Sequence, residues 1–116
     1  MREDANTPQS VPIHSERLRA PRHQFVVRIE LTDKQSERCI SGNTKDLSPL
    51  GCFAVTVDSF PEGTKVRLRI SRGETHVVAQ GEVTYLLHGS GMGIAFTTVE
   101  PSSLPILNVW LAGLRK

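Results

Sequence analysis

Six consecutive residues, 46–51, combine side chains that can bind a ligand with residues that turn the backbone. The Asp46 carboxylate accepts hydrogen bonds and the Ser48 hydroxyl can both donate and accept, while Pro49 and Gly51 favour a tight bend. We call residues 46–51 the Asp46 corner. One interpretation is a corner in which the two side chains bond to nearby backbone N–H groups. The other is a corner that presents them to a ligand.

An arginine-rich stretch, which we call the arginine segment (residues 16–23), stands just ahead of the first strand-like run. A guanidinium pairs bidentately with phosphate or with the O6/N7 edge of guanine and stacks on the base. A carboxylate can accept from the N1–H and exocyclic amine of guanine, and Gly51 allows close backbone approach. We therefore expect both segments to contact one phosphorylated purine; an ordinary solvated charged run is the alternative. The predicted contact residues are Arg17, Arg19, Arg22, Asp46, Ser48 and Gly51.

Alternating apolar and polar residues predict six strands that would bring these segments together. The runs lie near residues 25–31, 38–45, 53–57, 66–70, 76–87 and 92–96, with turn residues between them. This spacing is typical of an antiparallel barrel or sandwich. Gly81 marks a bend or bulge in the longest run.

The end of the chain has a helical period. Leu104, Leu107, Leu111 and Leu114 recur at intervals of three and four residues. A helix over about residues 102–115 follows, with Ser102 or Ser103 as its cap and Pro105 in its first turn. The predicted organisation is a flexible tail over 1–15 and a single domain over 16–116, with the barrel over about 24–98.

Composition narrows the function classes. The chain has 116 residues, of which 38% are hydrophobic, enough for one modest core. A net charge of +2 argues against wrapping duplex nucleic acid. No apolar run approaches the length of a membrane span and the N-terminus lacks a signal-peptide pattern, so we expect a cytoplasmic protein without membrane insertion.

The chemistry of an enzyme is not evident in the sequence. The chain has no nucleophile setting, no carboxylate pair and no phosphate-cradling glycine motif, so we expect no catalytic residues and no cofactor. The four histidines have no partner at ligand spacing, which predicts no metal site. Cys39 and Cys52 lack metal spacing and are interpreted as reduced thiols. Tyr85 and Trp110 are expected in the core or an interface, with base-stacking platforms as the less favoured alternative.

The chain resembles the PilZ domain family, bacterial receptors for cyclic di-GMP. The family signature is an R-x-x-x-R segment before the first strand and a [D/N]-x-S-x-x-G turn, which the Asp46 corner matches in full. The similarity covers about residues 16–97. The resemblance implies a mainly β fold, a six-stranded antiparallel barrel with a C-terminal helix, in agreement with the strand count. It runs through residues 61–64, 81–83 and 93–96.

The first motif departs from the family pattern. Arg22 matches the second arginine, but Leu18 stands where the first is expected, with Arg17 and Arg19 on either side of it. If neither neighbour substitutes, losing one bidentate guanidinium worth about 1–3 kcal/mol weakens binding roughly 5- to 150-fold. If the segment is flexible, Arg17 or Arg19 can recover much of that loss, and we favour this outcome.

Two functions follow from the resemblance. In the first, the chain is a non-enzymatic receptor whose arginine segment folds over cyclic di-GMP and so switches its affinity for an effector protein, as in the control of motility or biofilm formation. In the second, it is a PilZ-like protein–protein interaction domain that binds nucleotide weakly or not at all, which Leu18 favours. The helix stripe is broadened by Ile106, Val109 and Trp110. The helix therefore either lies in a groove or meets another chain, and in the second case the expected partner is a second copy in a homodimer.

Overall fold

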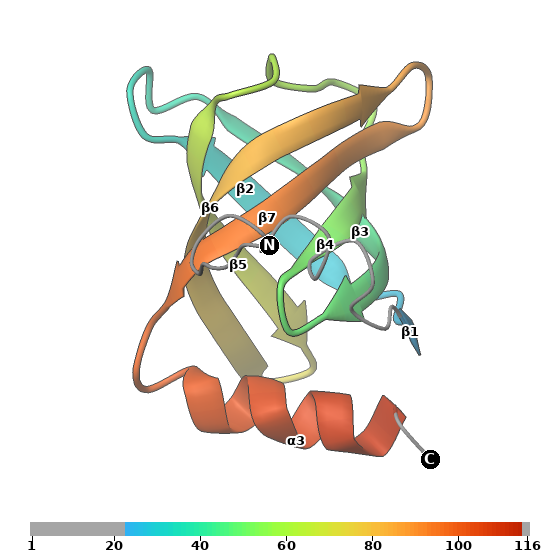
Figure 1. Cartoon of the computed structure of the whole chain (residues 1–116), viewed down its shortest axis with the longest axis vertical. Helices are drawn as coiled ribbons and strands as arrows, with labels where there is room; N and C mark the ends of the chain where they lie inside the picture. Colours follow the sequence, from blue (N-terminus) through green and yellow to red (C-terminus); the bar gives the residue numbers. More distant parts are fainter. Residues whose placement is uncertain (1–22, 115–116) are drawn as a thin grey trace, which may run out of the picture.

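The computed structural model describes residues 23–114, which form seven strands and one helix (Figure 1). The arrangement is a sheet curled around a core, with the helix lying across one end. In chain order the elements are β1 (His23–Gln24), β2 (Arg28–Asp33), β3 (Cys39–Ser48), β4 (Gly51–Val55), β5 (Lys65–Arg72), β6 (Thr75–Leu87), β7 (Gly91–Val99) and α3 (Leu104–Leu114).

The sheet closes on itself. Its strand order is β1-β3-β2-β5-β6-β7-β4, and an additional pairing between β3 and β4 joins the two sides, so β2 to β7 form a six-stranded antiparallel barrel. The predicted barrel with a C-terminal helix is therefore confirmed. One strand was not expected from the sequence: β1, only two residues long, pairs with the second half of β3. The run predicted from residue 25 begins as a strand at Arg28.

The alternation in the sequence places apolar side chains inside the barrel. On β5, Val66, Leu68 and Ile70 are buried, while Lys65 and the two arginines between them face solvent. Phe60, which is 2% exposed, fills one end of the barrel, where its backbone N–H contacts the Sδ of Met92 at 3.3 Å. Each barrel end is thus closed by an aromatic or helical element that keeps water from the core.

Helix α3 closes the other end through Leu107, Trp110 and Leu111, its buried residues. The Trp110 ring centroid lies 5.3 Å from that of Phe25. Ser103 precedes the helix and its carbonyl accepts from the Leu107 N–H at 2.9 Å, as expected for an N-cap position. Its hydroxyl, however, accepts from the Val78 N–H of β6 at 2.8 Å, so this side chain fastens the helix to the barrel.

Irregularities in the long strands agree with the glycine signals. The register between β6 and β7 shifts at Gln80/Gly81 and again between Val83 and Tyr85, which confirms the predicted bend at Gly81. Strand β4 ends at Val55, so Val57, which continues the alternation in the sequence, lies beyond the strand and is fully exposed. Among residues 23–114, Cys39 and Cys52 are not joined by a disulfide: Cys39 is exposed and Cys52 is buried.

Candidate functional site

The N-terminal part of the predicted site lies outside the described residues, which begin at His23. This part comprises Arg17, Arg19, Arg22, Leu18 and the expected tail over 1–15. What the structure does describe is where the chain enters the barrel. In the pairing of β1 with β3, His23 lies opposite Leu47 and Gln24 opposite Asp46. The chain that continues from the arginine segment therefore enters the fold alongside the Asp46 corner.

Backbone hydrogen bonds hold the Asp46 corner together. The Ser48 side chain is 3% exposed; its hydroxyl accepts from the Leu50 N–H at 3.1 Å and donates to the Gly51 carbonyl at 3.4 Å. Asp46 is half-buried, and its Oδ1 accepts from the Phe53 N–H at 3.2 Å. These bonds confirm the capping interpretation for both side chains. They also fix the carboxylate in one orientation, and contact with a ligand stays a prediction.

Gly51 is required by the packing of two strands. A Cβ atom at this position would lie 2.1 Å from the carbonyl oxygen of Ile94 on β7. No side chain larger than hydrogen fits without moving one backbone away from the other. The glycine of the motif thus serves the barrel itself, and close approach of a ligand to its backbone remains a prediction.

Sequence reasoning missed an aromatic surface beside the corner. Across three pairings, Asp46 lies opposite Phe53, Phe53 opposite Gly93, and Gly93 opposite Tyr85, so these residues form a row on the outer face of β3, β4, β7 and β6. The rings of Phe53 and Tyr85 are 6.0 Å apart, and the Nζ of Lys45 lies 5.8 Å from the Phe53 centroid. We call Lys45, Phe53 and Tyr85 the aromatic row.

Glycine makes room for this row. A Cβ at Gly93 would lie 2.1 Å from the Tyr85 ring, so the ring lies against the bare backbone of β7. Tyr85 is 38% exposed, whereas Phe53 beside it is only 4% exposed. The signal that could have found the row is a glycine within a strand pattern, which often marks a close approach. Its meaning depends on the pairing register, which the sequence alone does not give.

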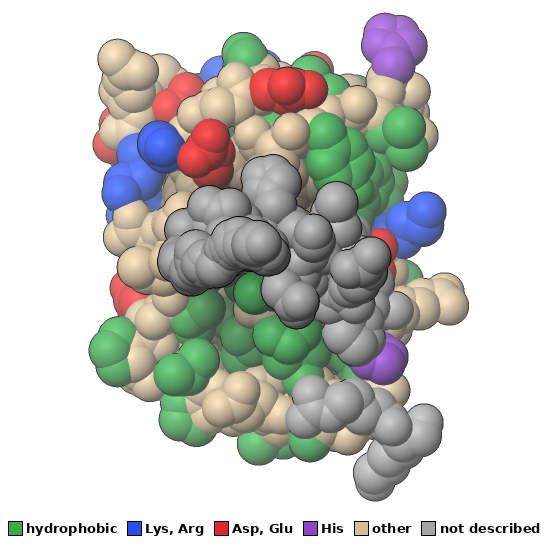
Figure 2. Space-filling view, in the orientation of Figure 1, with side chains coloured by type: hydrophobic (Ala, Val, Ile, Leu, Met, Phe, Trp, Pro, Cys, Tyr) green, Lys and Arg blue, Asp and Glu red, His purple; other side chains and the backbone are tan. Residues whose placement is uncertain are grey.

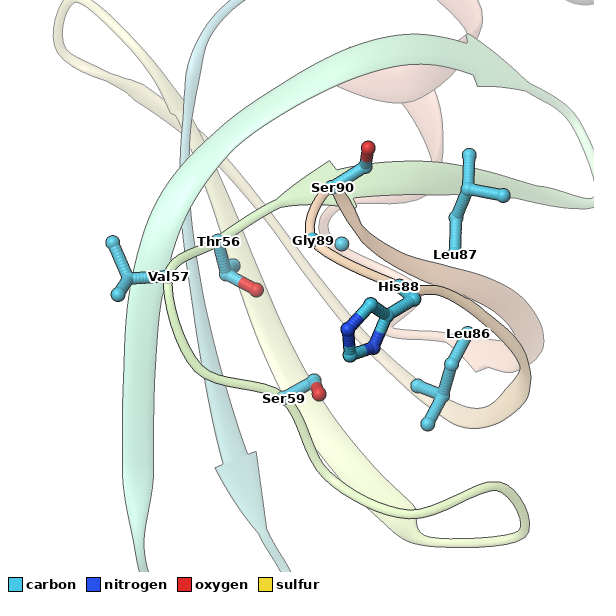
Figure 3. Close-up of a pocket in the computed structure, with 9 residues that line it drawn as sticks. Thr56, Val57, Ser59, Leu86, Leu87, His88, Gly89 and Ser90 are labelled. Atoms are coloured by element: carbon cyan, nitrogen blue, oxygen red, sulfur yellow. The ribbon is translucent and has the colours of Figure 1, made fainter.

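A hollow lies at the opposite end of β4 from the Asp46 corner. It is a hollow of about 140 Å³ between the loop after β4 and the turn joining β6 to β7, and the His88 ring points toward the loop that carries Ser59 (Figure 3). Hydrophobic side chains gather at the upper right of Figure 2, over this hairpin. Val57, Leu86 and Leu87 line the hollow, and the two leucines are 41% and 52% exposed. None of the predicted contact residues lies here.

Among residues 23–114, no three His, Cys, Asp or Glu side chains come together in a group that could hold a metal ion. The helix of this part of the chain is too short to cross a bilayer.

A closed barrel, a helix across one end and an Asp-x-Ser-x-x-Gly corner beside the chain's entry define a small β-barrel binding domain. The model of the PilZ domain family matches residues 16–112, and the chain therefore belongs to this family. PilZ domains are known as cyclic di-GMP receptors, a binding rather than a catalytic family.

A solved structure supports the fold. The chain resembles the crystal structure of the PilZ domain of CeSA from a cellulose-synthesizing bacterium with a TM-score of 0.63. The match covers 84% of this chain and 100% of that domain at 19% identity, which is a likeness of fold. No curated protein matches the chain.

Proposed function

We propose that this chain is a cytoplasmic, non-enzymatic receptor that binds cyclic di-GMP between its arginine segment and the Asp46 corner and thereby changes its affinity for an effector protein. The proposal rests on one observation above the others, the pairing of β1 with β3. Gln24 lies opposite Asp46 and His23 opposite Leu47. The arginine segment therefore ends, at His23, opposite Leu47 of the corner.

The corner supplies the chemistry for guanine. The Asp46 carboxylate, oriented by the Phe53 N–H, is suited to accept from the N1–H and exocyclic amine of the base. Ser48, buried in the turn, acts by holding that turn in shape. Arg17, Arg19 and Arg22 supply the forks that pair with the two phosphates and stack on the bases. No cofactor or metal takes part in this binding mode.

The aromatic row extends this surface. Tyr85, 38% exposed, offers a ring face in line with Asp46, and Lys45 holds a positive charge over the neighbouring Phe53 ring. Aromatic faces stack on nucleobases of any sequence, and base–aromatic stacking is worth about 1–3 kcal/mol per base. A planar, doubly negative guanine compound fits a surface that combines a carboxylate, a ring and cations.

Calorimetric titration with cyclic di-GMP tests the proposal. The wild-type protein should give binding heat at tens of micromolar, and Asp46→Asn should weaken binding roughly 5- to 150-fold because asparagine cannot accept two charge-assisted bonds. Arg22→Ala should weaken it by a similar factor. Arg67→Ala is the matched control: Arg67 faces solvent on β5, paired between Thr32 and Gln80, and should bind as the wild type does.

The Leu18→Arg variant separates the two functions named above. If the wild type gives no heat while Leu18→Arg binds, the natural site is disabled at the first motif position. The chain is then the interaction domain rather than the receptor. If neither protein binds, the receptor proposal is wrong.

Specific surfaces favour the interaction domain as the second candidate. Helix α3 has no charged residue, and Leu104 and Val109 on its outer side are 45% and 69% exposed. Such a face suits a second copy of the chain or an effector protein. Sedimentation equilibrium should show self-association that Val109→Lys weakens. A monomer at all concentrations would leave the effector as the helix's partner.

A further inference from the structure

The outer side of strand β5 carries a row of cations. Lys65, Arg67 and Arg69 alternate with buried apolar residues, and all three are exposed. Cations and carboxylates of the neighbouring strands and of the turn after β2 adjoin this row. We call the set the basic face: Arg28, Lys34, Lys65, Arg67 and Arg69, with Glu30 and Glu82 among them. Five cations against two carboxylates give this face a larger positive excess than the net +2 of the whole chain.

The two carboxylates of the basic face are paired with cations at its margins. The Nζ of Lys65 lies 3.0 Å from the Oε1 of Glu82. Glu30 lies opposite Arg69 in the sheet, but its Oε2 accepts from the Nη2 of Arg28 at 3.2 Å. Lys65 and Arg28 are therefore neutralised within the fold, and the two arginines between them are not.

Arg67 and Arg69 form no ion pair among residues 23–114. Arg67 lies between Thr32 of β2 and Gln80 of β6, and the amide oxygen of Gln80 already accepts from the Nζ of Lys34. On its β6 side Arg69 meets Val78, whose side chain has no acceptor. Within the described chain, both guanidinium groups thus keep N–H donors that point away from the barrel.

The spacing of the two arginines indicates the chemistry of a partner. Side chains two residues apart on a strand point the same way and lie roughly 7 Å apart. Alternate side chains of an extended peptide have the same spacing, so carboxylates at positions i and i+2 can each meet one guanidinium fork. A single-stranded nucleic acid fits less well, because the basic face contains no aromatic ring on which bases could stack.

We propose that the basic face is a docking surface for a protein segment that carries carboxylates at alternate positions. In the barrel, β5 is three strands away from β4 in either direction, so this face lies on the opposite side from Gly51 and the aromatic row. Figure 1 shows β5 at the back of the barrel and β7 at the front. No residue of the Asp46 corner or the arginine segment belongs to the basic face, so the inference is independent of cyclic di-GMP binding.

Fluorescence anisotropy with a labelled eight-residue peptide of alternating glutamate and serine tests the proposal. At low salt the wild-type protein should bind this peptide, and the same peptide with glutamine in place of glutamate should not bind. Arg67→Gln and Arg69→Gln should each weaken binding about threefold, and the double variant about tenfold. Both side chains are exposed, so these variants keep the fold.

Arg38→Gln is the matched control for a change of one charge. Arg38 lies outside the basic face, 3.8 Å from Asp58, and its variant should bind the glutamate peptide within about twofold of the wild type. An equal loss in Arg38→Gln and Arg67→Gln would show attraction by net charge alone and would overturn the inference. Absence of binding by the wild type up to about 1 mM protein would also overturn it.

A ten-residue oligothymidylate tests the other class of partner. It should bind more weakly than the glutamate peptide. Tighter binding that is lost in the Arg67→Gln/Arg69→Gln variant would assign the basic face to nucleic acid and overturn the proposal.

Discussion

The two ends of strand β4 use similar residue types for different purposes. At the Asp46 corner, where Gly51 pairs with Ala95, both small residues of the motif serve the fold. The Ser48 hydroxyl bonds to the backbone of the turn, and Gly51 allows β4 to approach β7 closely. At the other end, where Val55 pairs with Gly91, the turn of residues 88–90 is also made of small and polar residues, but it leaves apolar neighbours exposed. Gly51 and Val55, which mark the two regions, are four residues apart on one strand, or about 13 Å. The first region is constrained by hydrogen bonds and close packing, and the second has apolar side chains exposed to solvent.

The largest expected effect comes from enlarging a glycine in each region. Gly51→Ala should destabilise the protein by about 3 kcal/mol, because the new Cβ would meet the Ile94 carbonyl at 2.1 Å. Gly89→Ala should cost only about 1 kcal/mol: Gly89 has a φ of 78°, where alanine is strained, but nothing lies within 4 Å of its Cβ. Urea unfolding of both variants measures the difference. Equal costs would mean that β4 and β7 can separate freely at the corner.

The hydroxyls of the two turns give a smaller contrast. Ser48→Ala should lower the free energy of unfolding by about 1 kcal/mol, since it removes the acceptor of the Leu50 N–H. Ser90→Ala should change it by less than about 0.5 kcal/mol, because Ser90 is exposed and bonds to Leu87 through its backbone N–H. Thermal unfolding of the pair is the measurement. A loss at Ser90 as large as that at Ser48 would show that the second turn is equally constrained.

The smallest effect on stability is expected at Val57. This side chain is fully exposed, so Val57→Ser should change the free energy of unfolding by less than about 0.5 kcal/mol. The Val57→Ser variant should bind cyclic di-GMP with the affinity of the wild type, since Val57 lies beyond the end of β4 that is far from the corner. Reduced nucleotide binding in Val57→Ser would mean that the two regions are coupled.

The fold could be predicted from the sequence wherever the apolar residues of an element repeat with the period of a strand or of a helix. The strand pattern of residues 65–72 and the helical pattern after residue 103 are local, and both elements appear in the structure. Strand β1 could not be found, because two residues have no period. The role of Thr44 could not be predicted either, because a threonine within a strand pattern is an ordinary polar position. Only the structure shows that β3 pairs with β2 up to Asn43 and with β1 from Asp46, and that the Thr44 hydroxyl between them accepts from the Val27 N–H.

The candidate site was predictable only where a motif is contiguous. Residues 46–51 signal a corner by their order alone, and the structure shows how they form it. The two rings of the aromatic row, Phe53 and Tyr85, meet across Gly93 only because of the pairing register of three strands, so no stretch of sequence contains this arrangement. The side of β4 on which Phe53 lies, outside the barrel and opposite Asp46, likewise follows from pairing rather than from hydrophobicity.

The contact between Phe25 and Trp110 has a practical consequence. Trp110 is the only tryptophan of the sequence, is 4% exposed, and its ring packs at a tilt against Phe25, the first aromatic residue after β1. Its fluorescence therefore comes from one known place, the point where the incoming chain rests on the C-terminal helix. Any rearrangement that lifts Phe25 would change the emission of an unlabelled sample, which makes the chain its own optical reporter.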